Sequence, residues 1–129
     1  MAPSIRYLEM RHVEFVMERE GTGPIRDAGL VESALFRPST TVMGADAYPS
    51  IGEKAAALLH SLCLNHPLVD GNKRLAAASA LILLQINGHR ASLTNDELFA
   101  LTMGVASGTM RDVPTIATRL NVVPRASAP

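Results

Sequence analysis

The feature that most limits how this chain can fold is an apolar run, LAAASALILLQIN, at residues 75–87. On a helix this run is apolar nearly all round, and Gly88 follows it where helices commonly end in glycine. A helix without a polar face has to be buried, so the remaining segments must pack around it. Aromatic residues make up only 4% of the chain while alanine is abundant, which favours helices that approach one another closely.

The remaining apolar residues also recur at helical spacing. Ser50 with Glu53 and Thr94 with Glu97 have the S/T-x-x-E pattern of a capping box. An aspartate two residues before Pro114 is typical of another helix start. Together with glycine and proline at segment ends, these patterns predict further helices at about 6–20, 27–36, 51–65, 95–107 and 112–120.

Two stretches do not follow this spacing. Residues 40–47 begin with the β-branched residues TTV, and we interpret them as a surface loop or a small flap. The tail VVPRASAP, from about residue 122, is expected to be frayed. The predicted fold class is therefore all-α: a compact single-domain bundle of about six helices over residues 1–129, with a possible short flap.

The charge balance limits the kinds of partner that the chain can bind. Twelve Lys and Arg residues balance twelve Asp and Glu residues, so no net charge attracts the chain to nucleic acid or to an anionic membrane. We find neither a membrane-spanning run nor a secretion signal. The single cysteine, Cys63, can form no internal disulfide, which agrees with the reducing cytoplasm. We expect a cytoplasmic protein that binds neither nucleic acid nor membrane directly.

Polar groups are concentrated just before the buried helix, in the segment HPLVDGNKR at residues 66–74. Its proline and glycine break one helix and allow the next to begin at about Asn72. The first-turn N–H groups of a helix attract anions. Gly71 lets a phosphate approach the backbone, and Lys73 and Arg74 add two cations. These features indicate a phosphate site, although the P-loop spacing is absent.

Two further residues of this segment offer chemistry of their own. Asp70 would repel an anion, so it serves either as a helix cap or as a ligand for Mg²⁺ that bridges nucleotide phosphates. His66 can take a proton from an attacking hydroxyl, because imidazole ordinarily has a pKa of about 6.5. Taken singly, Asp70 is more often a cap, Lys73 and Arg74 a solvated face, and His66 an ordinary loop residue. Their occurrence within nine residues favours a functional site.

These residues also carry a family resemblance. The segment EKAAALLHSLCLNHPLVDGNKR, at residues 53–74, resembles the Fic/Doc superfamily, specifically its Doc (death-on-curing) toxin branch. Fic proteins have the pattern H-x-F-x-[DE]-G-N-G-R-x-x-R, and Doc-like proteins are closer to H-x-F-x-[DN]-[AG]-N-K-R. The resemblance extends through GLVESALFRP upstream and INGHRASLTNDEL downstream, so it covers about residues 6–121. It implies the Fic/Doc fold and a type II toxin–antitoxin system.

The resemblance implies a role for each residue of the motif. His66 matches the catalytic base, which activates a hydroxyl of the target, and Asp70 matches the acidic Mg²⁺ position. The residues of the anion hole and of the nucleotide phosphate site match Gly71, Asn72, Lys73 and Arg74. The stretch at residues 40–47 lies where the family has a flap that docks the target chain.

Three positions differ from the Fic pattern. Leu68 replaces the phenylalanine that anchors the loop in the core, a change between large apolar residues that costs little. Lys73 replaces the second motif glycine. Ala77 stands in place of the second arginine, which helps to hold the nucleotide for AMP transfer. The Doc branch resembles this pattern and binds ATP in the opposite sense, so that a threonine of elongation factor Tu is phosphorylated.

The resemblance therefore implies a Doc-like toxin kinase. Such an enzyme transfers the γ-phosphate of ATP, with Mg²⁺, to a Ser/Thr hydroxyl of a translation protein, here elongation factor Tu, and blocks translation and growth. The alternatives are Fic-type AMP or NMP transfer to a protein hydroxyl, and a catalytically silent protein that binds nucleotide or antitoxin. The chain has no inhibitory [ST]-x-x-x-E-[GN] pattern, so inhibition is expected from a separate Phd-like antitoxin.

Overall fold

The structure, a computed structural model, describes residues 4–126 and is mainly helical. Its elements in chain order are α1 (Met10–Glu20), α2 (Ala28–Phe36), the 3-10 helix η1 (Arg37–Ser39), β1 (Thr41–Val42), β2 (Ala45–Asp46), α3 (Ile51–Asn65), α4 (Asn72–Ile86), β3 (His89–Ala91), α5 (Asn95–Ala106), α6 (Val113–Leu120) and β4 (Val122–Pro124). The expected all-α class is confirmed. No helix in residues 4–126 combines the length and the apolar character needed to cross a lipid bilayer.

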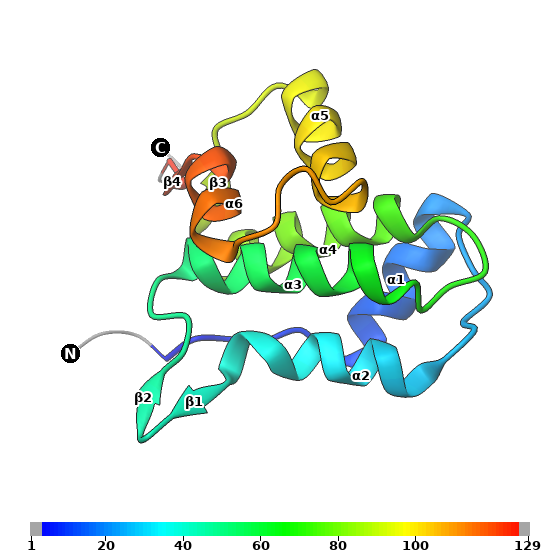
Figure 1. Ribbon diagram of the computed structural model, residues 1–129, viewed down its shortest axis with the longest axis horizontal. Helices are drawn as coiled ribbons and strands as arrows, with labels where there is room; N and C mark the ends of the chain where they lie inside the picture. The colour runs from blue at the N-terminus through cyan, green and yellow to red at the C-terminus, as the bar shows by residue number, and fades with distance from the viewer. Residues whose placement is uncertain (1–3, 127–129) are drawn as a thin grey trace.

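The antiparallel pair α3 and α4 forms the centre of the fold (Figure 1). α2 lies on one side of this pair and α5 and α6 on the other, while α1 packs against α4. The alanines that let these helices approach closely are fully buried: Ala55, Ala56, Ala57, Ala76 and Ala80. Large apolar side chains such as Leu62 and Leu83 complete one continuous core. The prediction of a buried helix at residues 75–87 is confirmed, although α3 contributes more of the buried side chains.

Side-chain caps fix the starts of four helices. The capping groups accept a backbone hydrogen bond from the first turn that they precede, and they are Asp27 for α2, Ser50 for α3, Thr94 for α5 and Asp112 for α6. Thr94 and Glu97 form the full reciprocal capping box. The helix starts predicted from local patterns are therefore confirmed, because a cap is decided by residues three apart.

The spacing of apolar residues predicts that the first helix begins at about residue 6. In the structure it begins at Met10. The reason is a contact with the far end of α4. The N–H of Arg6 donates to Oδ1 of Asn87 over 2.8 Å, and Nδ2 of Asn87 donates to the carbonyl of Arg6 over 2.8 Å. Both backbone polar groups of Arg6 are bonded to Asn87, so Arg6 lies outside the helix. Leu8, which also precedes the helix, is still buried in the core.

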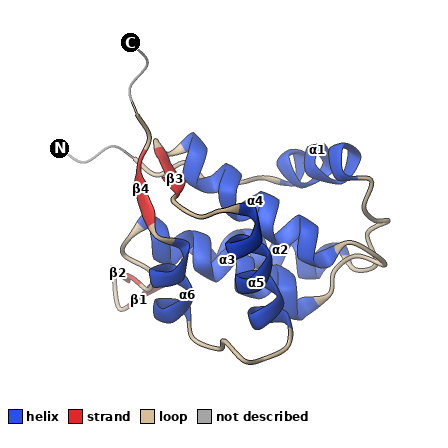
Figure 2. Cartoon of the chain, turned by 90° about the horizontal axis from the view of Figure 1, so that it is seen from above, coloured by secondary structure: helices blue, strands red, loops and turns tan. Residues whose placement is uncertain are grey.

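The expectation of a frayed tail from about residue 122 is wrong where the structure describes it. β4 pairs antiparallel with β3, with Arg90 opposite Val123, and Figure 2 shows the two strands side by side. Beyond the pairing, the N–H of Arg125 donates to the carbonyl of Gly88 over 2.9 Å. Residues 127–129 of the predicted tail lie outside the described residues. Helical spacing could not indicate two strands of three residues each whose paired residues lie 31 to 35 positions apart in sequence.

Residues 40–47 do form a small flap. β1 and β2 pair antiparallel, with Val42 opposite Ala45. The turn between them, Met43 and Gly44, has positive φ at both residues, 53° and 83°, as tight hairpin turns require. Val42 and Met43 are exposed, and the hairpin projects beyond the end of α2 (Figure 1).

Candidate functional site

The N-terminus of α4 is left open, unlike the side-chain-capped starts of α2, α3, α5 and α6. Its N-cap is Gly71, which has no side chain to offer. The N–H groups of Asn72, Lys73 and Arg74 therefore lie in a first turn that has neither helical acceptors nor a side-chain cap. The alternative that Asp70 caps this helix is wrong. An uncapped helix N-terminus with two adjacent cations attracts an anion.

Gly71 is required for a reason that the sequence does not show. Its φ of 90° lies in the left-handed region that favours glycine. A Cβ at this position would lie 2.3 Å from Cγ2 and 2.5 Å from Cβ of Thr22. Thr22, from the segment after α1, thus packs against the side of Gly71 on which a Cβ would lie. Gly71 serves the close approach of two chain segments.

Asn72 and Leu68 fix the shape of the loop. Oδ1 of Asn72 accepts from the N–H of Leu68 over 2.8 Å, and Nδ2 donates to the carbonyl of Leu68 over 3.0 Å. The Leu68 side chain is 2% exposed and belongs to the core, so leucine anchors the loop as expected. The amide of Asn72 therefore holds the loop through both of its polar atoms, and its backbone N–H lies in the open first turn of α4.

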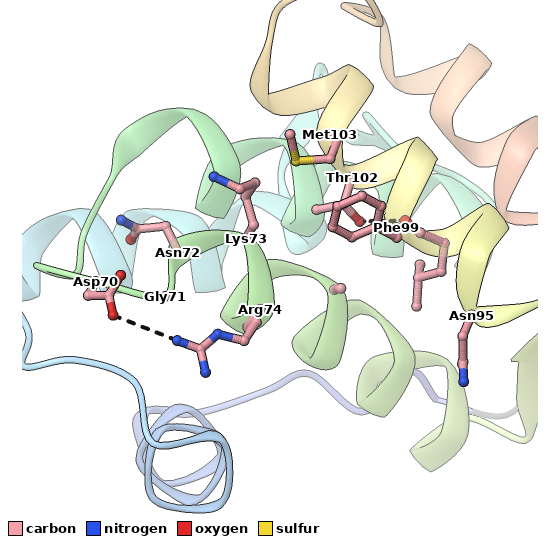
Figure 3. Close-up of a pocket in the computed structure, with 11 residues that line it drawn as sticks. Asp70, Gly71, Asn72, Lys73, Arg74, Asn95, Phe99, Thr102 and Met103 are labelled. Atoms are coloured by element: carbon pink, nitrogen blue, oxygen red, sulfur yellow. Dashed lines mark hydrogen bonds and ion pairs between the residues drawn. The ribbon is translucent and has the colours of Figure 1, made fainter.

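A cavity of about 470 Å³ opens beside the start of α4. One wall is polar and consists of the motif residues from Asp70 to Arg74. The opposite wall is contributed by α5 (Figure 3) and holds Asn95, Leu98, Phe99, Thr102 and Met103, and Ala77 of α4 also lines the cavity. Pockets of this size accommodate small organic ligands. The cavity therefore combines an anion-attracting end with an apolar face.

The apolar wall was not predicted, because α5 lies more than twenty residues from the motif in sequence. Phe99 is 67% exposed, so its ring is not needed by the core and is free to contact a ligand. Met103 is 39% exposed in the same wall. The hydroxyl of Thr102 donates to the carbonyl of Leu98 over 2.8 Å, so it is already used within the helix.

Two charged side chains meet at the polar wall. Nη2 of Arg74 lies 3.7 Å from Oδ2 of Asp70 (Figure 3), and Nη1 of Arg74 donates to the carbonyl of Glu20 over 2.9 Å. The side chains are 52% and 80% exposed, so this ion pair is weak. Lys73 is exposed and adds a second cation. A polyanionic ligand can therefore compete with Asp70 for Arg74.

Asp70 could take part in a metal site only with help from a ligand. Within residues 4–126 no group of three His, Cys, Asp or Glu side chains is placed to hold a metal ion. Mg²⁺, however, is commonly bound through one or two carboxylates, with the remaining positions filled by water and substrate phosphates. One exposed carboxylate beside a phosphate-attracting helix end fits that arrangement, and the role of Asp70 stays a prediction.

His66 stands apart from the cavity. It is the C-cap residue of α3, with a left-handed backbone at φ 48° and ψ 55°. Its side chain is exposed and is not among those that line the cavity. The structure thus brings the five motif residues from Asp70 to Arg74 together and places His66 at the other end of the loop, open to a partner approaching from solvent.

A segment that the sequence marked only as a helix end holds the whole loop in place. We call residues 20–27 the buttress segment. Its backbone forms four hydrogen bonds with the loop: Gly23 N–H to Asp70 O (2.9 Å), Val69 N–H to Pro24 O (2.9 Å), Arg26 N–H to Pro67 O (2.7 Å) and Asp27 N–H to Pro67 O (3.1 Å). The loop is therefore supported by contacts that lie about 40 residues away in sequence.

Cys63 lies one turn before the loop and is not a reactive thiol. It is 1% exposed, and burial raises its pKa to about 12, against a smaller opposing effect of Lys73. A thiol with so high a pKa is not a nucleophile at neutral pH. Cys63 acts as a small buried apolar residue of the core.

Comparison with known proteins adds two findings. A model of the Fic/DOC family matches residues 5–84, which include α1 to α3, the loop and most of α4. A protein named Toxin Doc from Mycolicibacterium smegmatis is 59% identical over 64 residues, which are 50% of this chain and 49% of that protein. The alignment therefore spans about half the length of the curated relative.

Proposed function

The chain belongs to the Fic/DOC family, and from this premise we propose that it is a Doc-like toxin kinase. It transfers the γ-phosphate of ATP to a Ser/Thr hydroxyl of a translation protein, with elongation factor Tu as the target, and thereby stops growth. The similarity to a protein named Toxin Doc supports the toxin role. ATP and the translation apparatus place this activity in the cytoplasm.

The observation that carries the proposal is the two-sided cavity at the start of α4. A nucleoside triphosphate has a polyanionic end and a flat, weakly polar base. The open N–H groups of α4, with Lys73 and Arg74, suit the phosphates. The exposed ring of Phe99 suits the base, because aromatic side chains stack on bases. Neither half alone would distinguish a nucleotide from a simple anion or an apolar ligand.

In the proposed reaction His66 is the base. Its neutral imidazole accepts the proton of the target hydroxyl while that oxygen bonds to the γ-phosphorus, and the bond from this phosphorus to the β–γ bridging oxygen breaks to release ADP. Lys73 and Arg74 stabilise the charge that spreads over the phosphate oxygens. The exposure of His66 supports this role, since the target protein has to reach the imidazole from solvent.

Asp70 would hold Mg²⁺ together with the nucleotide phosphates. An ion held there would supply positive charge that offsets the charge of the phosphates. The long Asp70–Arg74 contact supports this assignment, because a pair at 3.7 Å between exposed side chains is readily exchanged for contacts with a metal and a phosphate.

We prefer phosphate transfer to AMP transfer because two positions, Ala77 and Lys73, differ from the pattern of the AMP-transferring enzymes. Ala77 lines the cavity without offering a charge, whereas the family's AMP-transferring enzymes have a second arginine there. Lys73 supplies a cation where those enzymes have glycine. We further propose that a Phd-like antitoxin restrains the toxin, since the chain carries no inhibitory helix pattern of its own.

The test incubates the purified chain and elongation factor Tu with ATP labelled either at the γ-phosphate or in the adenine, and weighs the intact target. A gain of one phosphate supports the proposal. A gain of AMP would replace it with nucleotide transfer, and no modification with any nucleotide would favour a silent binder. His66→Ala should slow transfer by roughly 10²–10⁴-fold, whereas His89→Ala, in β3 outside the cavity lining, is the matched control.

A further inference from the structure

One arginine outside the motif holds the end of the helix that carries His66. Nε of Arg26 donates to the carbonyl of His66 over 2.9 Å, and Nη2 donates both to that carbonyl and to the carbonyl of Asn65, the latter over 3.3 Å. These are the last carbonyls of α3, which lack helical partners and carry the negative end of the helix dipole. A guanidinium is well suited to them, because it is always charged and donates from several N–H groups.

His66 needs such support because of its backbone. Its φ of 48° is left-handed, which is unfavourable for a residue with a Cβ. α1 and α6 also end in left-handed residues, Gly21 and Asn121, and there the N–H of the end residue bonds back to the helix. In the part of the chain that the structure describes, α3 has no such bond at His66. The contact with Arg26 takes its place.

Arg26 is itself held on both sides. Its own N–H donates to the carbonyl of Pro67 over 2.7 Å, and its neighbour Ile25 pairs with Leu68. On the other side Asp27 caps α2 through the N–H of Leu30 over 3.2 Å. The backbone of Arg26 is thus held in place relative to the loop, and its guanidinium extends from there to the end of α3.

The buttress segment consequently touches both ends of the loop. Arg26 binds the carbonyl of His66, and three residues earlier Gly23 donates to the carbonyl of Asp70 over 2.9 Å. A segment that does not line the cavity therefore connects the base to the phosphate site. A catalytic group displaced by about 1 Å can cost about 10²-fold in rate.

We propose that Arg26 is a positioning residue for His66: it fixes the left-handed end of α3 and so sets the place of the base relative to the phosphate site. The expected effect of Arg26 on catalysis rests on the proposed function. Its expected effect on the backbone does not, because the hydrogen bonds to the end of α3 exist whatever reaction the site performs.

The experiment compares wild type, Arg26→Ala and Arg26→Lys, with Arg111→Ala as the matched control. Nε of Arg111 also donates to a backbone carbonyl, that of Gly108, over 2.7 Å, and lies outside the cavity lining. For each protein we would measure kcat and KM for phosphoryl transfer to elongation factor Tu, Kd for ATP by calorimetry, and amide hydrogen exchange at residues 60–69 and 72–76.

Arg26→Ala should lower kcat by roughly 10- to 100-fold, leave the Kd for ATP within about twofold, and speed exchange at residues 60–69 but not at 72–76. Lysine should restore part of kcat, since one ammonium can replace one of the donors, and Arg111→Ala should match wild type. An unchanged kcat, or a loss of ATP affinity as large as the loss of kcat, would overturn the proposal.

The exchange measurement separates this inference from the proposed function. If wild type transfers nothing to any target, the proposed function fails, and the role of Arg26 is still decided by the amides. Faster exchange at the end of α3 in Arg26→Ala, with wild-type exchange in Arg111→Ala, supports the positioning contact. Equal exchange in all four proteins overturns it.

Discussion

The ammonium of Lys54 lies 3.2 Å from Oδ2 of Asp46, and this ion pair joins the flap to the core. Lys54 is on α3 and only 1% exposed, whereas Asp46 is on β2 and 52% exposed. The other partners of the ammonium are the carbonyl of Pro38, at 3.3 Å, and the ring of Tyr7, whose centroid lies 5.7 Å away. Asp46 therefore supplies the charge that balances a buried cation.

Asp46→Ala should destabilise the protein by about 2–3 kcal/mol, somewhat less than the ~3–5 kcal/mol for breaking a fully buried pair, because Asp46 is half exposed. Urea unfolding measures the change. Adding Lys54→Met should recover much of the loss, since no buried charge then remains. Arg11→Gln, which breaks the exposed Arg11–Glu9 pair, is the control and should destabilise the protein much less than Asp46→Ala. Equal losses in the two single variants would contradict the assignment.

The parts of the fold that could be predicted are those decided by near neighbours in sequence. Ser50, Thr94 and Asp112 each cap a helix through a residue three positions later, and the buried helix is visible in its own composition. Features decided by distant residues were missed. Arg6 lies outside the first helix and bonds to Asn87, 81 positions away, and the paired residues of β3 and β4 lie 31 to 35 positions apart.

The candidate site divides in the same way. The anion-attracting start of α4 is local, so the motif itself reveals it. The apolar wall of α5 and the contact of Arg26 with His66 are tertiary, and nothing in the spacing of either segment indicates them. Gly71 has a further structural reason that the motif does not reveal: the absence of a Cβ allows Thr22 to pack against it.

Gly71→Ala should destabilise the protein more than the same change at Gly88. Both glycines have a left-handed φ, 90° and 78°, which alone costs alanine about 1–2 kcal/mol. At Gly88 nothing lies within 4 Å of the added Cβ, whereas at Gly71 it would meet Thr22 at 2.3 Å. Urea unfolding of both variants isolates the contact with Thr22. Should Thr22→Gly fail to narrow the difference, the clash is not its cause.

His60 should make the stability depend on pH. Nδ1 of His60 lies 2.8 Å from Nη1 of Arg37, so the ring nitrogen has to be unprotonated to accept that hydrogen bond. Burial, and secondly the charge of Arg37, lower the pKa of His60. A histidine whose pKa is lower when folded takes up its proton more readily when unfolded, so its contribution is present above about pH 6.5 and declines as the pH falls below that value.

The measurement is urea unfolding of wild type and His60→Gln at pH 7.5 and 5.5. Glutamine can still accept from Arg37 and does not titrate in this range, so the variant should lose less stability between the two pH values than wild type. The carboxyls with a lowered pKa, Glu9, Glu97 and Asp112, are common to both proteins and cancel in the comparison. Identical pH dependence in the two proteins would show that His60 is not the titrating group.

Phe99→Ala tests whether the apolar wall of the cavity binds the base of a nucleotide. Loss of one aromatic–base stack costs about 1–3 kcal/mol, so the Kd for ATP should rise by roughly 5- to 150-fold. Because Phe99 is 67% exposed, the free energy of unfolding should change by less than about 0.5 kcal/mol. Calorimetry gives the Kd for ATP and for inorganic triphosphate, which has no base to stack. The control is Phe36→Ala, a ring that is 72% exposed at the end of α2 and outside this cavity. A stacked base predicts that Phe99→Ala weakens ATP alone, while equal weakening of both ligands would mean that the ring acts on the phosphate site instead.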